Sequence, residues 1–276
     1  MKIRGLIILI FVFFNTKVFA QEVEIVDTTR WLCTYNYEFM QDSASRYSLK
    51  SEQMTLQKGS HLSKFGSTNQ LLADSLIYAL RNEDMGNAVK KLGPFISSHY
   101  TNLLCNYKIY KNFPGKDTLF FTAYEGGKFL KVLQPEKFNW KIENKDTLLL
   151  GYRCQKATNS FAGRNYVAWF TPQIPINDGP YKFAGLPGLI VKINDTKNQH
   201  CFTLTSIQKL RYVQFITFNK SDYLDVTPKE FVRAVYANLA SLFGRVQGGD
   251  ITITSEDGKA KSLHGLKSLN NFIEKY

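Results

Sequence analysis

Alternating apolar and polar positions dominate this chain. Between residues 30 and 40, the side chains Trp31, Cys33, Tyr35, Tyr37 and Phe39 fall on one face and polar residues on the other. A period of two with many aromatic residues is typical of a half-buried strand. Residues 57–67 read as a turn and a short extended piece. Further strands are expected at 47–56, 102–110, 118–123, 128–134, 145–159, 165–170, 189–194 and 201–210.

Two segments carry a helical period instead. Residues 69–80 place leucines and alanines at helical spacing, and Thr68 is the expected cap. The run Thr227-Pro228-Lys229-Glu230 supplies a complete capping box with proline at the first helical position. This second helix is expected to end near Phe243, with Gly244 closing it. Its apolar side predicts packing against a sheet and consists of Phe231, Val232, Val235, Leu239 and Leu242.

These elements together predict a mainly β fold: a curved antiparallel sheet, half-barrel-like or an open barrel, with one or two packed helices. Residues 82–94 read as polar and irregular. The segment 21–276 is expected to be a single β-rich domain, with a helix-containing C-terminal part from about residue 211.

The first twenty residues differ from the rest of the chain. Lys2 and Arg4 precede ten uncharged, mainly apolar residues, and Val18-Phe19-Ala20 follows a short polar stretch. This layout predicts a secretory signal peptide over 1–20, cleaved between Ala20 and Gln21. Retention as a membrane anchor is the alternative, but ten helical residues span only about 15 Å, roughly half of a bilayer core. No transmembrane helix is expected in the mature chain.

The charge changes this picture little. The formal charge is +12, and removal of residues 1–20 takes away three cations and no anions, leaving +9. The lysines are scattered, with Lys90-Lys91 the densest group, whereas a nucleic-acid surface gathers them on one face. No nucleic-acid partner is expected.

Four cysteines permit two disulfides in an oxidising compartment, with three possible connectivities. The pairs Cys33–Cys105 and Cys154–Cys201 are the favoured guess, and four unpaired cysteines buried in strands are the alternative. No C-x-x-C pair is present, so the spacing predicts neither a zinc site nor a thioredoxin-like pair.

The segment 169–195 is the most unusual in the chain. Three prolines, Pro172, Pro175 and Pro180, prevent regular ladder pairing. Around Asp178-Gly179 the sequence predicts one turn, and Gly185-Leu186-Pro187-Gly188 predicts a type II turn with positive φ at the last glycine. The following residues, beginning with Leu189, then enter a buried strand. Turn chemistry alone accounts for these residues, and a loop that binds a ligand or partner is the alternative.

Here the chain resembles the GLPGLI family, named for the hexapeptide that stands intact at 185–190. The resemblance extends to Gly151-Tyr152-Arg153-Cys154-Gln155-Lys156-Ala157, to Phe161-Ala162-Gly163-Arg164, and to Ala168-Trp169-Phe170-Thr171, Ile174-Pro175 and Asp178-Gly179-Pro180-Tyr181-Lys182-Phe183. It implies an exported protein of Bacteroidetes-type bacteria with two membranes, and it names no reaction. The motif residues are Gly151, Tyr152, Cys154, Gly163, Arg164, Trp169, Pro175, Gly179, Pro180, Gly185, Leu186, Pro187, Gly188, Leu189 and Ile190.

No spacing in the chain marks a catalytic or metal site. The four histidines form neither H-x-x-x-H nor H-E-x-x-H, and G-x-S-x-G is missing. His200 and Cys201 could approach Cys154 if their strands pair, although a strand-edge histidine is the plainer interpretation. We therefore expect no cofactor and assign no catalytic or metal-binding residue.

The favoured hypothesis is a non-catalytic cell-envelope protein, located in the periplasm or at the outer-membrane periphery, that binds a hydrophobic ligand such as a lipid, or a peptide or envelope-protein partner. This hypothesis rests on the high content of 21 Phe and 15 Tyr together with the lack of catalytic signatures. A secreted hydrolase with dispersed catalytic residues is one alternative. An outer-membrane β-barrel is the other, favoured by many short strands and by the terminal Phe272 and Tyr276.

Overall fold

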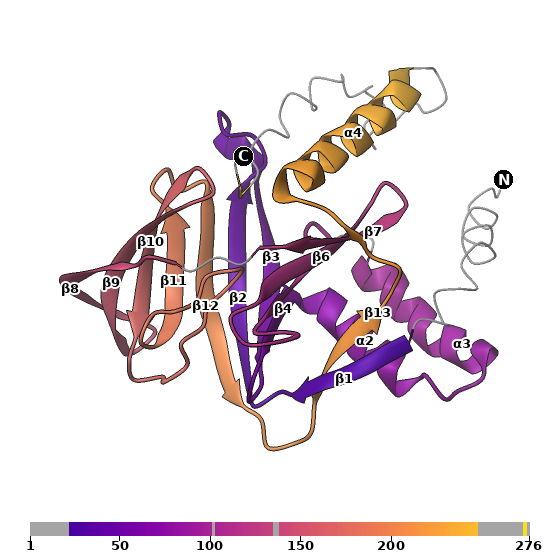
Figure 1. Ribbon diagram of the computed structural model, residues 1–276, viewed down its shortest axis with the longest axis horizontal. Coiled ribbons are helices and arrows are strands. Elements are labelled where there is room, and N and C mark those ends of the chain that lie inside the picture. Colours follow the sequence, from indigo (N-terminus) through magenta and orange to yellow (C-terminus); the bar gives the residue numbers. More distant parts are fainter. Residues whose placement is uncertain (1–21, 101–102, 135–137, 248–272, 275–276) are drawn as a thin grey trace.

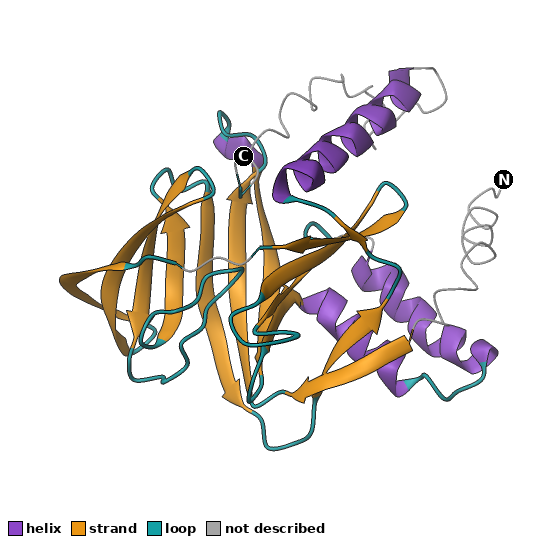
Figure 2. Cartoon of the chain, in the orientation of Figure 1, coloured by secondary structure: helices purple, strands orange, loops and turns teal. Residues whose placement is uncertain are grey.

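The structure, a computed structural model, describes residues 22–100, 103–134, 138–247 and 273–274. The expected signal peptide, its cleavage site at Ala20 and Gln21, and the terminal Phe272 and Tyr276 lie outside these residues. The described chain is mainly antiparallel β-structure, with helices at its periphery (Figures 1 and 2). The mainly β prediction is confirmed.

One large sheet is built from two meanders. The first contains β2 (Trp31–Met40), β3 (Leu49–Lys58), β4 (Ser63–Ser67), β5 (Tyr107–Lys111), β6 (Leu119–Glu125) and β7 (Lys128–Leu133). The second contains β8 (Lys141–Leu149), β9 (Tyr152–Phe161), β10 (Arg164–Thr171), β11 (Leu189–Asp195) and β12 (His200–Lys209).

The pairing of β2 with β12 joins the two meanders in the middle of the sheet, as Figure 1 shows. Within each meander, strands that follow one another in sequence are neighbours in space. The short strand β14 (Leu224–Asp225) adds in parallel to β7, so the described twelve-stranded sheet is open, with β14 and β8 at its edges. A separate ribbon pairs β1 (Glu22–Thr28) with β13 (Phe215–Lys220).

The main hydrophobic core lies on one face of the joined meanders. On β2 the side chains of Cys33, Tyr35 and Tyr37 are buried, as the alternating pattern predicts. The Tyr37 ring stacks on Phe202 of β12 with 4.0 Å between ring centroids, so an aromatic cross-strand pair secures the junction.

Helix α2 (Thr68–Ala79) confirms the first predicted helix, with Ser67 rather than Thr68 at the cap position. The Thr68 hydroxyl is instead hydrogen-bonded to Thr55 at 2.8 Å. A short 3-10 turn, η1 (Arg46–Ser48), precedes β3, and a π-helical turn, η2 (Ile96–Tyr100), follows α3.

Helix α3 (Met85–Phe95) corrects the expectation of an irregular segment at 82–94. Asp84 caps it by accepting a hydrogen bond from the Asn87 backbone at 3.0 Å, and Ala88 and Leu92 pack beside α2. Two glycines and Pro94 concealed this helix from sequence analysis, because both residue types weaken helices.

Helix α4 (Pro228–Gln247) confirms the capping box. Thr227 N donates to the Glu230 carboxylate at 2.7 Å, and Glu230 N donates back to the Thr227 hydroxyl at 3.3 Å. Contrary to expectation, the helix continues through Gly244. Figure 1 places α4 away from α2 and α3, next to β6 and β7, where the Phe231 ring meets Phe121 edge to face at 4.8 Å. No helix within the described ranges has the length and apolar character needed to cross a membrane.

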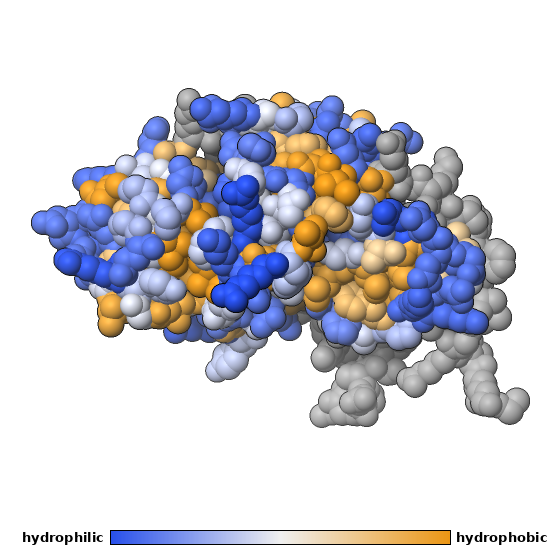
Figure 3. Space-filling model, turned by 90° about the horizontal axis from the view of Figure 1, so that it is seen from below, coloured by the Kyte–Doolittle hydropathy of each residue, from blue (hydrophilic) through white to orange (hydrophobic). Residues whose placement is uncertain are grey.

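The expected strand at 145–159 is two strands, β8 and β9, joined by a tight hairpin. Leu150 and Gly151 both have positive φ, at 51° and 79°. A leucine in this conformation is uncommon, so the turn is hard to predict from the residues alone. On the outer surface, apolar side chains form separate patches divided by hydrophilic ones in the view of Figure 3.

Candidate functional site

The segment 172–188 folds back over the inner face of the second meander. Its apolar side chains Ile174, Ile176, Phe183 and Leu186 are buried. Backbone hydrogen bonds fasten it to β11: Leu189 N donates to Ile174 O at 3.1 Å, and Ile190 N donates to Asp178 O at 3.1 Å. The segment 172–188, which we call the motif layer, therefore forms a second layer above the sheet.

The turn before β11 differs from the predicted type II turn. Gly188 N donates to Leu186 O at 2.8 Å, which is the three-residue hydrogen bond of a γ-turn centred on Pro187. The predicted positive φ at Gly188 is confirmed, at 152°. A Cβ on Gly188 would lie 2.2 Å from the Thr171 carbonyl oxygen, so only glycine fits this close approach.

A buried ion pair lies beneath the motif. Asp178 forms salt bridges with Lys111 and, at 3.8 Å, with Lys58. The Lys111 ammonium also donates to Gly179 O at 2.8 Å, so β5 is bound directly to the motif backbone. Burial would raise the pKa of Asp178, but the two lysines outweigh it and hold that pKa below 3.8. Burial lowers the pKa of Lys111 despite its carboxylate partner.

The remaining motif residues are distributed along the second meander. Gly151 and Gly163 provide positive φ in two hairpin turns, and the buried Arg164 forms a salt bridge with Asp195 at 2.9 Å. Tyr152 and Trp169 are half-buried. Pro175 and Pro180 lie in the layer above the sheet. These residues form hairpin turns or packing contacts. Among the family residues, only those from Asp178 to Ile190 lie close together in the structure.

All four cysteines carry free thiols, which corrects the favoured disulfide guess for Cys33–Cys105 and Cys154–Cys201. Cys154 on β9 and Cys201 on β12 are separated by two intervening strands, a distance of about 14 Å across a sheet. A disulfide requires Cα atoms within about 7 Å. The same separation keeps the His200–Cys201 pair away from Cys154.

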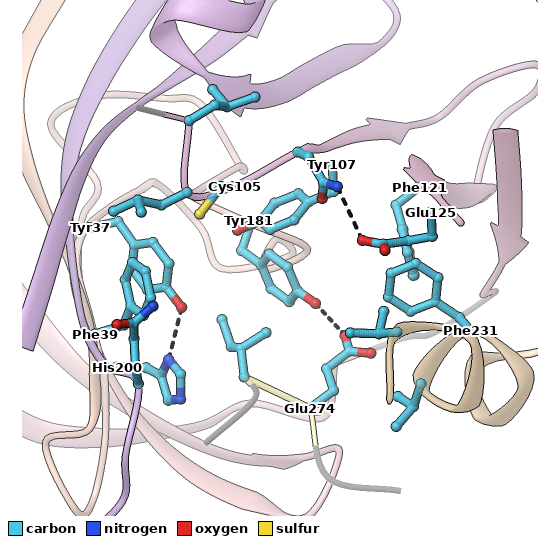
Figure 4. A pocket seen from close by; sticks show the side chains of 17 residues that line it. Tyr37, Phe39, Cys105, Tyr107, Phe121, Glu125, Tyr181, His200, Phe231 and Glu274 are labelled. Atoms are coloured by element: carbon cyan, nitrogen blue, oxygen red, sulfur yellow. Dashed lines mark hydrogen bonds between the residues drawn. The ribbon is translucent and has the colours of Figure 1, made fainter. Parts of the chain in front are cut away.

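A cavity of about 350 Å³ opens between the sheet and α4. Figure 4 shows aromatic side chains from several elements facing it. Helix α4 contributes Phe231, Val232 and Val235 as one wall. The aromatic side chains that line the cavity are Tyr37, Phe39, Tyr107, Phe121, Tyr181 and Phe231. We refer to it as the aromatic pocket.

A few polar groups are placed around this apolar lining. The Tyr37 hydroxyl is hydrogen-bonded to His200 Nδ1 at 2.8 Å. Glu125 accepts from the side-chain amides of Asn106 and Asn238, each at 3.1 Å, and thereby attaches α4 to β6. Tyr181 donates to Glu274 at 2.7 Å (Figure 4). Buried at the pocket wall, the Tyr107 hydroxyl has no hydrogen-bond partner among described nitrogen and oxygen atoms.

A second cavity, of about 830 Å³, lies next to the motif and is more polar. Asn177, Asp178 and Gly185 line it together with Lys58 and Lys111. Tyr181 lines the aromatic pocket and the adjacent Lys182 lines the polar cavity. The Lys182 ammonium also reaches the wall of the aromatic pocket, where it forms a salt bridge with Glu274.

Residues 161–192, from the end of β9 to the middle of β11, match the family model described as protein of unknown function (Porph_ging). No curated protein matches the chain. Two solved structures, titled as PNGF-II in the P21 and the C2 space group, are similar to it at 13% identity and a TM-score of 0.49. They cover 77% and 76% of this chain, which spans about a third of theirs, at 34% and 33%.

Sequence reasoning did not find the aromatic pocket. Its lining comes from β2, residues 103–106, β5, β6, the segment 172–188, β12, α4 and residues 273–274, and no local pattern unites these segments. The apolar side of the capped helix was the one usable signal, because it predicted a surface that must meet the sheet.

Replacement of Gly188 by alanine should lower the free energy of unfolding by about 3 kcal/mol or more, because the added Cβ overlaps the Thr171 carbonyl. Gly127→Ala is the matched control: its φ is also positive, at 83°, but nothing lies within 4 Å of the added atom. The control should cost about 1 kcal/mol. Urea denaturation measures both variants, and equal losses would contradict the close-packing account.

Lys111→Met should lower the free energy of unfolding by about 3–5 kcal/mol, because it removes the principal salt-bridge partner of the buried Asp178 carboxylate. The double variant Lys111→Met/Asp178→Leu should recover part of this loss.

The same ion pair predicts a pH dependence. Because the folded pKa of Asp178 is depressed, the contribution of Asp178 to the free energy of unfolding is complete above pH 3.8 and is lost as pH falls through the folded value. Urea titrations between pH 2 and pH 7 should therefore show a weaker acid-induced loss in the double variant. Full additivity of the two substitutions would refute the coupling.

Proposed function

We propose that this protein is a non-catalytic binding protein of the cell envelope, which takes an apolar ligand, or an apolar side chain of a peptide or protein partner, into the aromatic pocket. The observation that carries the proposal is the pocket itself: about 350 Å³ of space lined by six aromatic residues. Ligand sites are typically concave, mainly apolar and between about 300 and 1,000 Å³.

The lining supports an apolar ligand with a polar end. A phenyl-sized group that buries about 150 Å² gains about 4 kcal/mol at 25 cal/mol per Å², before the costs of association. Tyr107, Glu125 and His200 supply polar atoms at the wall that can orient such a molecule. The sheet and α4 form opposite walls of the pocket.

We also propose that the chain belongs to the GLPGLI family and is exported, with residues 1–20 acting as a signal peptide. The intact hexapeptide at 185–190 supports the family, and the match of 161–192 to a family of unknown function covers the same region. The basic start and the short apolar run support export. The periplasm or the outer-membrane periphery is the proposed location.

Filling the pocket should abolish binding of an apolar probe. Val235→Trp places a large ring in the wall that α4 contributes, so the affinity for a fluorescent probe such as anilinonaphthalene sulfonate should fall at least tenfold. The control, Leu148→Trp, adds the same ring at a surface position of β8 that is 71% exposed and outside the pocket. Equal probe binding by the two folded variants would count against the pocket as the binding site.

Expression of the full chain in a bacterium with two membranes should yield a mature protein that begins at Gln21. Intact-mass analysis of the envelope fraction measures this directly. A control with Lys2 and Arg4 both replaced by glutamate should keep its first twenty residues, because the basic front directs export. Recovery of the unaltered full-length chain in the cytoplasm would rule out the export proposal.

A further inference from the structure

Residues Ile273 and Glu274 lie against the aromatic pocket although they are distant in sequence from its other walls. The Tyr166 hydroxyl donates to Ile273 O at 3.0 Å, and the Tyr181 hydroxyl donates to the Glu274 carboxylate at 2.7 Å. Neither residue belongs to a strand or helix. Side chains of the sheet and the motif therefore bind this short piece of chain much as they would bind a separate peptide.

The carboxylate of Glu274 meets a buried cation. Lys182 forms a salt bridge with it and also donates to Gln134, and the side chain of Lys182 is only 1% exposed. The Lys182 ammonium lies 4.3 Å from the centroid of the Phe121 ring, which stabilises it further. A buried ammonium is costly unless an anion accompanies it, so this position selects a carboxylate.

The side chains that bind this carboxylate are positioned by parts of the chain other than residues 273–274. Lys182 and Tyr181 are held by the motif layer, since Lys111 binds the carbonyl oxygens of Gly179 and Phe183 on either side of them. Glu274 itself supplies a carboxylate at the inner wall of an apolar pocket. A small molecule with an alkyl chain and a terminal carboxylate offers the same combination.

Resting on the proposed binding function, we propose that Tyr181 and Lys182 form a carboxylate subsite of the aromatic pocket, which Glu274 fills within the chain and which an amphipathic monocarboxylate fills as ligand. The alkyl chain lies among the aromatic rings, and the carboxylate replaces that of Glu274. Glu274 then competes with the ligand, so the wild-type protein binds the ligand more weakly than a variant that lacks the Glu274 carboxylate.

Octanoate and octanol, which differ in the charged head group, test this with the full chain. Isothermal titration of Glu274→Ala should show octanoate binding at least tenfold tighter than to the wild type, and octanol binding changed less than threefold. Octanoate should also raise the melting temperature of Glu274→Ala, because it restores an anion to Lys182. Glu274→Gln, which keeps the side-chain size, serves as a second variant.

The double variant Lys182→Met/Glu274→Ala is the control and should bind both probes alike. Equal binding of octanoate and octanol to Glu274→Ala would overturn the carboxylate subsite and leave the proposed function standing. Failure of both probes to bind any folded variant would instead refute the apolar pocket as a ligand site, and with it this inference. Preference for octyltrimethylammonium over octanoate would also overturn the subsite.

Discussion

The close approach of the chain at Gly188 to the Thr171 carbonyl is the constraint on which the rest of the site depends. It allows the segment 172–188 to return over the sheet instead of continuing away from it. Gly179 makes a similar approach, since a Cβ there would lie 2.7 Å from Ile190. Neither glycine has room for a side chain. The two close contacts therefore fix the position of the motif layer on the sheet, and with it the positions of the residues between these glycines.

Placement of the motif layer brings charged groups into the interior. Asp178 is neutralised by Lys111 and Lys58, and Lys182 by Glu274, so each buried charge has an opposite charge nearby. Such pairs contribute little net stability compared with apolar packing, but breaking one is costly. They therefore act mainly to fix geometry: Lys111 ties β5 to the motif, and Lys182 orients one wall of the aromatic pocket.

A feature of this structure can be predicted from the sequence when neighbouring residues determine it, and cannot when distant segments must first come together. The strand at 30–40 and the capping box at Thr227 are local patterns, and both are confirmed. Helix α3 was missed because its glycines and Pro94 oppose helical propensity, which packing against α2 overcomes. The hairpin at Leu150 was missed because leucine rarely adopts positive φ. The pocket could not be predicted, because β2, β5, β6, α4 and residues 273–274 meet only in the folded chain.

The central claim is that the space between the sheet and α4 holds an apolar molecule. Native mass spectrometry of the protein purified from the envelope without detergent, followed by solvent extraction, tests it most directly. We predict a mass excess corresponding to one bound apolar molecule per chain, released on extraction and missing from Val235→Trp. Recovery of the bare chain, or of the same adduct on Val235→Trp, would contradict the account.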